Sequence, residues 1–301
     1  MQKNLEISFY KLSNSQYHLI GLSILRIVIG LHLLWQLLLS FPIREELWQS
    51  HFLNPNIDIL HANFSFNFFY FAGIFIMIFY TLGLGNFLFK LLTYLFVLLL
   101  YAASPFLGDG GSNILMIVLA YMIFTNNSAY FSLFSKKCSQ NPFSRITHNL
   151  FLILILIQTC ILYFFAGFFK AQGAMWLHGT ALYYILNIDS FRMLNTNFLT
   201  EIVINSSFLL TVGAYSAIFL QLFFPLIVFN KYLKYLVLVG SIFFHLGIAF
   251  LMGLVQFGMI MIALDLLFLN DKEYKFIYGT IFKKRNLIKS RLFKPHSVNN
   301  S

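Results

Sequence analysis

Long apolar runs separated by short polar segments divide this chain. Six runs lie at about residues 19–41, 64–82, 87–103, 112–134, 148–169 and 202–229, and a longer one covers residues 235–269. A helix needs about 20 apolar residues to cross a bilayer, so each run is a candidate transmembrane helix. The last run is longer than one crossing needs, and we expect it to split near Gly253 into two helices with almost no loop. The pattern therefore predicts an all-α, polytopic membrane bundle of about eight transmembrane helices.

The segment between the fifth and sixth runs has a different character. Residues 170–197 mix apolar and polar positions, which suits a short interfacial or re-entrant helix better than a full crossing. The first apolar run is too long for the core of a signal peptide and has no small-residue cleavage site, so we expect it to remain as a transmembrane helix. We divide the chain into a transmembrane domain, residues 1–270, and a basic tail, residues 271–301.

The composition supports a membrane protein. Hydrophobic residues make up 59% of the chain and charged residues 10%. Soluble globular proteins contain about 45–50% apolar residues and about 25% charged residues. These proportions exclude an ordinary soluble protein. They indicate an integral, multi-pass protein of the cell membrane.

The net charge of +10 could suggest a nucleic-acid partner, but the distribution of the charge favours a signal for membrane topology. Eight of the twenty Lys and Arg residues lie between Lys272 and Lys294, after the last apolar run. With the N-terminus inside, sixteen of the twenty fall on the cytoplasmic side, and only Arg44 and Arg192 fall outside. Because cytoplasmic loops are enriched in positive residues, we expect both termini to be cytoplasmic. The tail is then a partner for anionic membrane lipids and not for nucleic acid.

The two cysteines suggest neither a disulfide nor a metal site. Cys138 lies in a polar loop and Cys160 lies within an apolar run, so we expect no bond between them. The chain has no CxxC motif and no cluster of Cys and His residues. We therefore expect no bound metal.

Some polar residues lie inside apolar runs, where a charge costs about 2.5–3.5 kcal/mol and needs a partner or a function. Arg26 is in the first run, and Gly30 lies on the same helix face four residues later. Arg26 is a candidate for binding an anionic substrate group or lipid phosphate, or for an internal ion pair or a clamp on backbone carbonyls. His245, in the seventh helix, could form a hydrogen bond between helices. Asp265 is five residues before Asn270 and could simply reach the cytoplasmic interface.

Asp109 begins the sequence Asp-Gly-Gly-Ser-Asn, which ends at Asn113 and opens the fourth run. An Asp at a helix N-terminus is an ordinary cap, because its carboxylate accepts hydrogen bonds from free backbone amides. The same turn could place this carboxylate opposite Lys170 at the outer end of the bundle. Asp109 is therefore also a candidate catalytic residue, with Asn113 as a candidate substrate-binding residue.

Lys170 ends the fifth apolar run, and Trp176, His178 and Gly179 follow it in a half-polar segment. A lysine near a helix end commonly extends its ammonium group to the lipid head groups. In a dry pocket, burial would instead favour the neutral amine, which can act as a base. Trp176 suits the aromatic belt at a membrane interface. Trp176 and His178 are candidate substrate-binding residues beside the amine.

These positions closely resemble the signature of the HTTM family. The matching pattern is Ala166-Gly167-x2-Lys170-x5-Trp176-x2-Gly179, supported by Arg26-x3-Gly30 and by His245-x11-Phe257-x-Met259. This family is the transmembrane module shared with vitamin K-dependent gamma-carboxylase, and it also occurs in SdpB-type proteins of bacterial antimicrobial-peptide systems. The resemblance covers about residues 15–270, so the transmembrane domain is expected to be HTTM-like.

The resemblance implies roles for particular residues. In the carboxylase, the lysine at the place of Lys170 is the base that deprotonates the reduced quinone, and the histidine at the place of His245 is expected to face the central cavity. Two positions depart from the carboxylase, which has a histidine where this chain has Gly111 and an acidic residue where it has His178. The carboxylase also continues into a large lumenal domain that this chain is not expected to have. In size the chain is closer to SdpB-type proteins.

Two functions of different classes follow from this resemblance. The first is an SdpB-like role in the maturation or export of a secreted antimicrobial peptide, with a small secreted precursor and an SdpA-like protein as partners. The second is an enzyme linked to a quinone or lipid, in which Lys170 is the base and His245 and Arg26 polarise the oxygens of a reduced quinone or vitamin K-like hydroquinone. A transporter or purely structural protein ranks last, because the helix-breaking glycines are not paired between the two halves of the chain.

Overall fold

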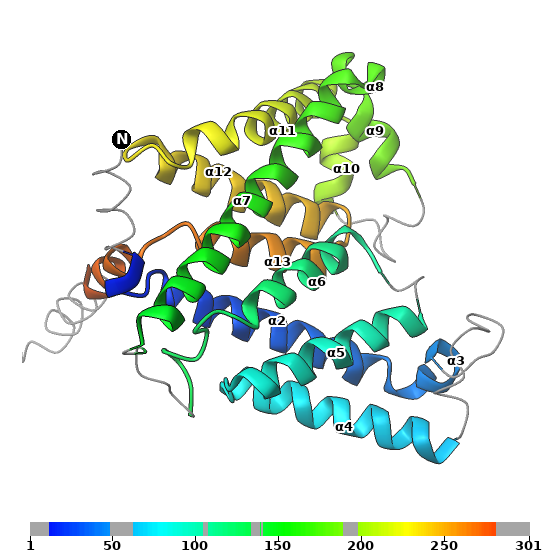
Figure 1. Ribbon diagram of the computed structural model, residues 1–301. Coiled ribbons are helices and arrows are strands. Elements are labelled where there is room, and N and C mark those ends of the chain that lie inside the picture. Colours follow the sequence, from blue (N-terminus) through cyan, green and yellow to red (C-terminus); the bar gives the residue numbers. More distant parts are fainter. Residues whose placement is uncertain are drawn as a thin grey trace, which may run out of the picture.

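The protein is an all-helical bundle within the part of the chain that the structure describes. The computed structural model describes residues 12–48, 63–104, 108–133, 139, 141–188 and 198–280, and their regular structure is helical throughout (Figure 1). Four helices are long and apolar enough to cross a membrane, and four shorter apolar helices pack with them. The chain is therefore a multi-pass membrane protein, as its hydrophobic pattern predicts.

The helices follow the predicted apolar runs, with some changes in length. The four long ones are α2 (Leu19–Leu39), α7 (Pro142–Gln172), α11 (Ser207–Ile227) and α12 (Leu233–Leu251), and the shorter apolar ones are α4 (Asn63–Leu82), α5 (Phe87–Ala103), α6 (Gly110–Met122) and α13 (Val255–Leu266). Short helices connect them, namely η1 (Phe41–Ile43), α3 (Arg44–Trp48), α8 (Ala174–Leu177), α9 (Ala181–Leu186) and α10 (Phe198–Ile204). Residues 271–280 form one further α-helical segment. The predicted split near Gly253 is confirmed, because this residue has a φ of +70° between α12 and α13.

The fourth predicted helix is wrong in its C-terminal half. The prediction ran to residue 134, but α6 ends at Met122. The following residues, Thr-Asn-Asn-Ser at 125–128, have side chains that compete with the backbone for hydrogen bonds and so weaken a helix. The segment instead lies along the end of α4, where the Leu133 amide donates to the Leu82 carbonyl at 3.0 Å. This path turns the carbonyls of Asn127 and Phe131 inward.

The sixth predicted helix is divided in two, whereas the segment before it has the predicted character. The sixth run forms α10 and α11, because the Ser206 side chain caps α11 through the Leu209 amide at 3.4 Å. Residues 170–188 contain the end of α7 and the short helices α8 and α9, in agreement with the prediction of short helices there. Residues 189–197, which include Arg192, lie outside the described residues, as do Cys138 and residues 281–301 of the predicted basic tail.

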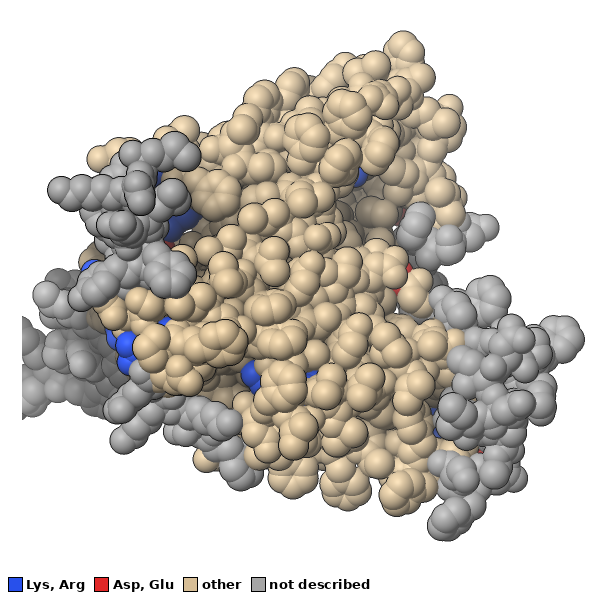
Figure 2. Space-filling view, in the orientation of Figure 1, with Lys and Arg blue, Asp and Glu red and all other residues tan. Residues whose placement is uncertain are grey.

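Figure 1 shows how the two ends of the bundle are built. The helix α7 crosses the whole bundle and leads into α8 and α9, which lie at the same end as α3 and the start of α6. We call this end the Lys170 end. The start of α2, the end of α13 and the helix at 271–280 lie at the opposite end, which we call the tail end. The face in Figure 2 is almost entirely uncharged between these ends, as expected for a surface in contact with lipid.

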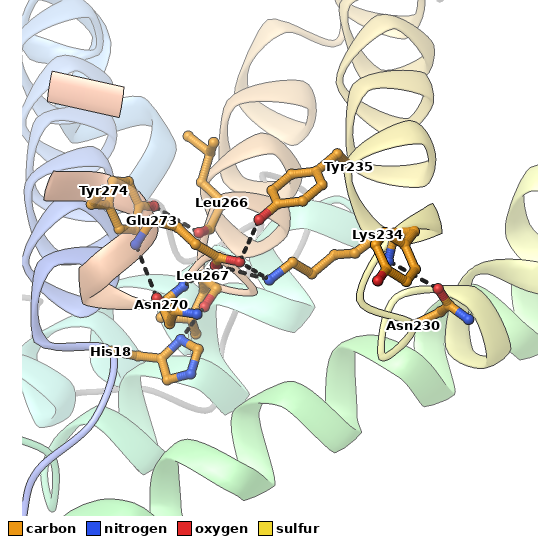
Figure 3. Close-up of polar contacts among 10 residues, drawn as sticks. His18, Asn230, Lys234, Tyr235, Leu266, Leu267, Asn270, Glu273 and Tyr274 are labelled. Carbon is orange, nitrogen blue, oxygen red and sulfur yellow. Dashed lines mark hydrogen bonds and ion pairs between the residues drawn. The ribbon is translucent and has the colours of Figure 1, made fainter. Parts of the chain in front are cut away.

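Polar contacts at the tail end join three parts of the chain (Figure 3). Lys234, at the start of α12, contacts both carboxylate oxygens of Glu273 at 2.6 and 2.8 Å. His18 contacts the Leu267 carbonyl at 2.8 Å and so ties α2 to the end of α13. Burial opposes ionisation of Glu273, but hydrogen bonds from Lys234, Tyr235 and the Asn270 amide outweigh it and lower the pKa of this carboxyl group.

The most extensive helix contact lies between α7 and α11. Gly167 makes this approach possible, because a Cβ atom there would lie 2.6 Å from the backbone nitrogen of Leu222. Small residues at membrane helix contacts allow backbones to come close together. The helix α13 lies against α2, α6 and α12 and so forms the centre of the bundle.

Candidate functional site

Four polar side chains meet inside the apolar core of the bundle. Tyr163 comes from α7, Ser241 and His245 come from α12, and Asp265 comes from α13, and all four are 0–1% exposed. We call them the interior polar cluster. The Tyr163 hydroxyl lies 2.8 Å from Asp265 Oδ1 and 2.7 Å from His245 Nε2, and the Ser241 hydroxyl donates to Asp265 Oδ2 at 2.6 Å. The two hydroxyl groups also contact each other.

Rings on several helices hold this cluster in place. The Tyr163 ring stacks on Phe224 of α11 with centroids 3.9 Å apart and planes at 8°. The His245 ring meets Tyr163 and Phe257 edge-on, at 5.8 and 5.7 Å. Ser241 and His245 are four residues apart and so lie on one face of α12. Each polar group is therefore fixed by packing as well as by hydrogen bonds.

The hydrogen-bond pattern leaves one acceptor in the cluster unused. When Tyr163 and Ser241 both donate to Asp265, His245 can donate from Nε2 to the Tyr163 oxygen and carry no hydrogen on Nδ1. Nδ1 is buried and has no partner among the described residues. A neutral histidine in this arrangement can accept a proton, and the hydroxyl and carboxyl groups behind it can pass one on.

The sequence predicted only part of this cluster. The expectation that Asp265 reaches an interface is wrong, because its side chain is fully buried and bonded to two other helices. Tyr163 and Ser241 were not predicted as site residues. Two spacings could have suggested them, since Tyr163 is two helical turns before Lys170 and Ser241 is one turn before His245.

Lys170 lies near the end of α7 and is half-buried. Its Nζ is 3.3 Å from the Ala166 carbonyl oxygen and lies over the Trp176 ring, 5.2 Å from the centroid. None of the carboxylates in the described ranges is within ion-pair distance of this amine. The amine is therefore held by an aromatic face and a carbonyl group rather than by an acidic partner.

The turn after Lys170 is held tightly by small residues. Gly179 has a φ of +71°, and a Cβ atom there would lie 2.9 Å from Thr211 on α11. The Tyr215 hydroxyl donates to the Leu177 carbonyl at 2.5 Å. Trp176 is half-buried beside the amine, whereas the candidate His178 is exposed. The two glycines of this motif therefore have a structural role: they allow α7 and the following turn to pack closely against α11.

Asp109 caps α6, because its Oδ1 accepts hydrogen bonds from the Ser112 amide at 2.7 Å and the Ser112 hydroxyl at 2.9 Å. The ordinary cap role is therefore confirmed for this residue. The structure does not pair it with Lys170. Asp109 instead lines a pocket with His32 and Gln256, and the candidate Asn113 is exposed on α6.

Arg26 is 1% exposed and donates hydrogen bonds to two backbone carbonyls, those of Asn127 at 3.0 Å and Phe131 at 2.6 Å. This geometry is the carbonyl clamp that the sequence left open as one alternative. Its Nε has no partner among the described residues. Gly30 lets α2 approach α4, since a Cβ atom there would lie 2.2 Å from Thr81 Oγ1.

A metal site is not formed by the described residues. None of their His, Cys, Asp and Glu side chains gather in a group of three or more that could hold an ion. Cys160 is buried in α7 and its thiol is free.

Comparisons with known proteins give one distant relationship. A segment of 143 residues is 30% identical to the uncharacterized protein YitO of Bacillus subtilis, and it covers 44% of this chain and 44% of YitO. The chain is no match to any family model. No solved structure matches it either. The comparisons therefore support distant homology to YitO without assigning a family.

Proposed function

We propose that this chain is an HTTM-type, SdpB-like membrane protein that acts in the maturation or export of a secreted antimicrobial peptide. A small secreted precursor and an SdpA-like protein would be its partners. In this proposal, residues 1–270 form the HTTM-like domain, with eight crossings and both termini in the cytoplasm. The basic tail after residue 270 then lies against anionic lipid head groups.

The observation that supports this proposal is the construction of the turn around Lys170. The resemblance to the HTTM family rests on Gly167, Lys170, Trp176 and Gly179. Gly167 packs the last turns of α7 against α11, the Lys170 amine lies over the Trp176 ring, and Gly179 packs the following turn against Thr211. The amine contacts the indole ring, and the two glycines bring the turn against α11.

Secretion of the mature peptide tests this function. Cells that express the precursor and the SdpA-like protein are expected to release mature peptide only when this chain is also present, as measured by mass spectrometry of the medium. Lys170→Ala is expected to abolish release while the protein still inserts into the membrane. Lys231→Ala is the matched control, since this lysine also lies near an aromatic ring, that of Tyr232, at 5.6 Å. Release without the chain would overturn the proposal.

A second candidate function is favoured by the observation that no carboxylate of the described residues pairs with Lys170. Here the neutral amine removes a proton from a reduced quinone or another lipid-soluble substrate. The interior polar cluster lies on the inner side of the same helix, where Tyr163 is about 10 Å along the axis from Lys170. His245 Nδ1, an unused acceptor, would bind a substrate hydroxyl group, and Arg26 is the further candidate for a substrate oxygen.

Substitution by arginine separates a base from an anchor at this position. Arginine keeps the positive charge and the contact with Trp176 but does not give up its proton. A base predicts that Lys170→Arg and Lys170→Ala both lose oxygen-dependent consumption of vitamin K hydroquinone by the purified protein. If Lys170→Arg keeps the rate of the unmodified protein, the base assignment is wrong and the lysine is an anchor.

A further inference from the structure

A second polar site lies between α2, α6 and α13, apart from the interior polar cluster and from the Lys170 turn. It is a cavity of about 610 Å³ whose lining includes neither Lys170 nor His245. Three polar side chains line it, namely His32 on α2, Asp109 at the start of α6 and Gln256 on α13. Neither the HTTM resemblance nor the proposed function assigns a role to His32 or to this cavity.

The polar groups of this cavity have unused hydrogen-bonding capacity. His32 is only 4% exposed, and its ring makes no hydrogen bond within the described part of the chain. Asp109 uses Oδ1 for the cap of α6, and its Oδ2 has no hydrogen bond to a described residue. A buried imidazole without a partner is costly in an apolar environment, so a ligand that supplies the partner would be favoured.

The charge of the cavity favours a cation. No Lys or Arg of the described ranges is within ion-pair distance of Asp109. The N-terminus of α6 offsets part of its negative charge, but Oδ2 is left without a cationic partner among the described residues. A carboxylate, an imidazole nitrogen and an amide oxygen are together three acceptors. A primary ammonium group has three N–H donors that can use them.

The rim of the cavity is apolar and exposed. Leu31, Trp35 and Met259 line it and are 48%, 59% and 41% exposed on the outside of the bundle. His32 is seven residues before the end of α2 and so lies about 10 Å along the helix axis from that end, whereas Asp109 lines the cavity from the start of α6. Tryptophan is a residue type favoured at membrane interfaces, and Trp35 lies at this rim. A ligand could therefore enter sideways from the bilayer, with its polar end in the cavity and its apolar body along the rim.

We propose that this cavity binds a membrane-dissolved amphiphile whose polar end is a primary ammonium group. The ammonium donates to Asp109 and to the His32 and Gln256 side chains, and the apolar chain lies against Leu31, Trp35 and Met259. This site is separate from Lys170, so it stands or falls independently of the proposed function.

Binding of dodecylamine to the full chain in nanodiscs tests this site. Trp35 lines the cavity, so its fluorescence reports occupancy, and the melting temperature gives a second reading. Dodecylamine is expected to bind saturably and at least about tenfold more tightly than dodecanol or dodecyltrimethylammonium, which lack the charge or the N–H donors. Asp109→Asn is expected to remove this preference, because Asn keeps the volume and the helix cap but not the charge.

Controls separate this site from its surroundings. Glu46→Gln removes an exposed carboxylate at the same end of the bundle, and Lys170→Ala removes the amine of the other site, so both are expected to bind dodecylamine unchanged. Nanodiscs of phosphatidylcholine alone and nanodiscs that also contain phosphatidylethanolamine distinguish the source of the ammonium. Competition by phosphatidylethanolamine identifies a bilayer lipid as the ligand, and its absence identifies a single-chain amine. Equal affinity for dodecanol, or an unchanged affinity in Asp109→Asn, would overturn the proposal.

Discussion

Several buried polar side chains of this bundle form hydrogen bonds that join different helices. Asp265 accepts hydrogen bonds from hydroxyl groups on α7 and α12, and Arg26 on α2 donates to carbonyls that follow α6. In the hydrocarbon region no water is present to replace such a partner, so each bond fixes the position of one helix against another. These residues are part of the reason that the helices adopt one arrangement.

Substitution of Asp265 tests how much the interior polar cluster contributes to the stability of the fold. Asp265→Ala removes the acceptor of two buried hydroxyl groups, and we expect a loss of about 2–5 kcal/mol in the free energy of unfolding. Asp265→Asn keeps one acceptor oxygen and is expected to lose less. Thermal unfolding in detergent micelles, followed by circular dichroism, measures both. An Asp265→Ala protein as stable as the unmodified one would contradict this account.

At the scale of elements, close contacts through glycine decide which helices pack together. Gly167 lets α7 approach α11, and Gly258 lets α13 approach α12, where a Cβ atom would lie 2.9 Å from the His245 carbonyl oxygen. The second contact places His245 beside α13 and so helps to assemble the interior polar cluster. Gly247, on the same helix as His245, has no neighbour within 4 Å of its Cβ position.

A pair of glycine substitutions tests this packing. Gly167→Ala is expected to lose about 1–3 kcal/mol, because the added methyl group meets backbone that cannot move aside easily. Gly247→Ala is the matched control within a helix and is expected to be neutral or to gain about 0.5–1 kcal/mol from helix propensity. Unfolding in micelles measures the difference. Equal effects of the two substitutions on the free energy of unfolding would show that the close α7–α11 contact does not require glycine at residue 167.

The Lys234–Glu273 ion pair at the tail end predicts how the stability of the fold depends on pH. Glu273 has a lowered pKa in the folded protein. Its contribution to folding stability is therefore complete above its ordinary pKa of 4.5 and is lost as the pH falls through the pKa of the folded state. We expect Glu273→Gln to cost about 1 kcal/mol at neutral pH and almost nothing in acid well below the ordinary value. Melting temperatures across this range check it. The control Glu45→Gln removes a pair at 3.3 Å in which Glu45 is 56% exposed, and it is expected to have little effect at any pH.

At the scale of the whole molecule, the bundle has two unlike ends. The Lys170 end carries the short helices α8 to α10 and the openings near Asp109, whereas the tail end carries the polar contacts of Figure 3. The proposed topology places the tail end in the cytoplasm, where positive residues are favoured. The Lys170 turn and the cavity lined by Asp109 then lie toward the outer half of the membrane, where a secreted peptide or an outer-leaflet lipid would arrive.

Reporter insertions test this orientation. Green fluorescent protein inserted after Thr280 is expected to fluoresce, and alkaline phosphatase at the same place is expected to be inactive, since these reporters function on opposite sides of the membrane. Alkaline phosphatase fused after Trp48 is expected to be active. The reverse pattern at both positions would invert the topology and contradict the proposed access from the outer side.

The hydrophobic pattern alone determined that this is a multi-pass membrane protein and the approximate place of most of its long helices. Runs of apolar residues must form helices in lipid, because their backbone groups have no other partners there. The break at Gly253 was also readable, since two crossings need a turn. The early end of α6 could not be predicted from the sequence. The Asn127 carbonyl that follows this helix is bound by Arg26, which lies 101 positions earlier in the chain.

Only the tertiary structure decided which polar residues share a site. The sequence identified His245 as a candidate, but the contacts that join it to Tyr163 and Asp265 depend on the rotation of three helices about their axes. The sequence also offered Asp109 as a partner for Lys170, and packing placed it beside His32 instead. The length of an apolar run fixes a helix, whereas the direction in which a side chain points is fixed by what packs against that helix.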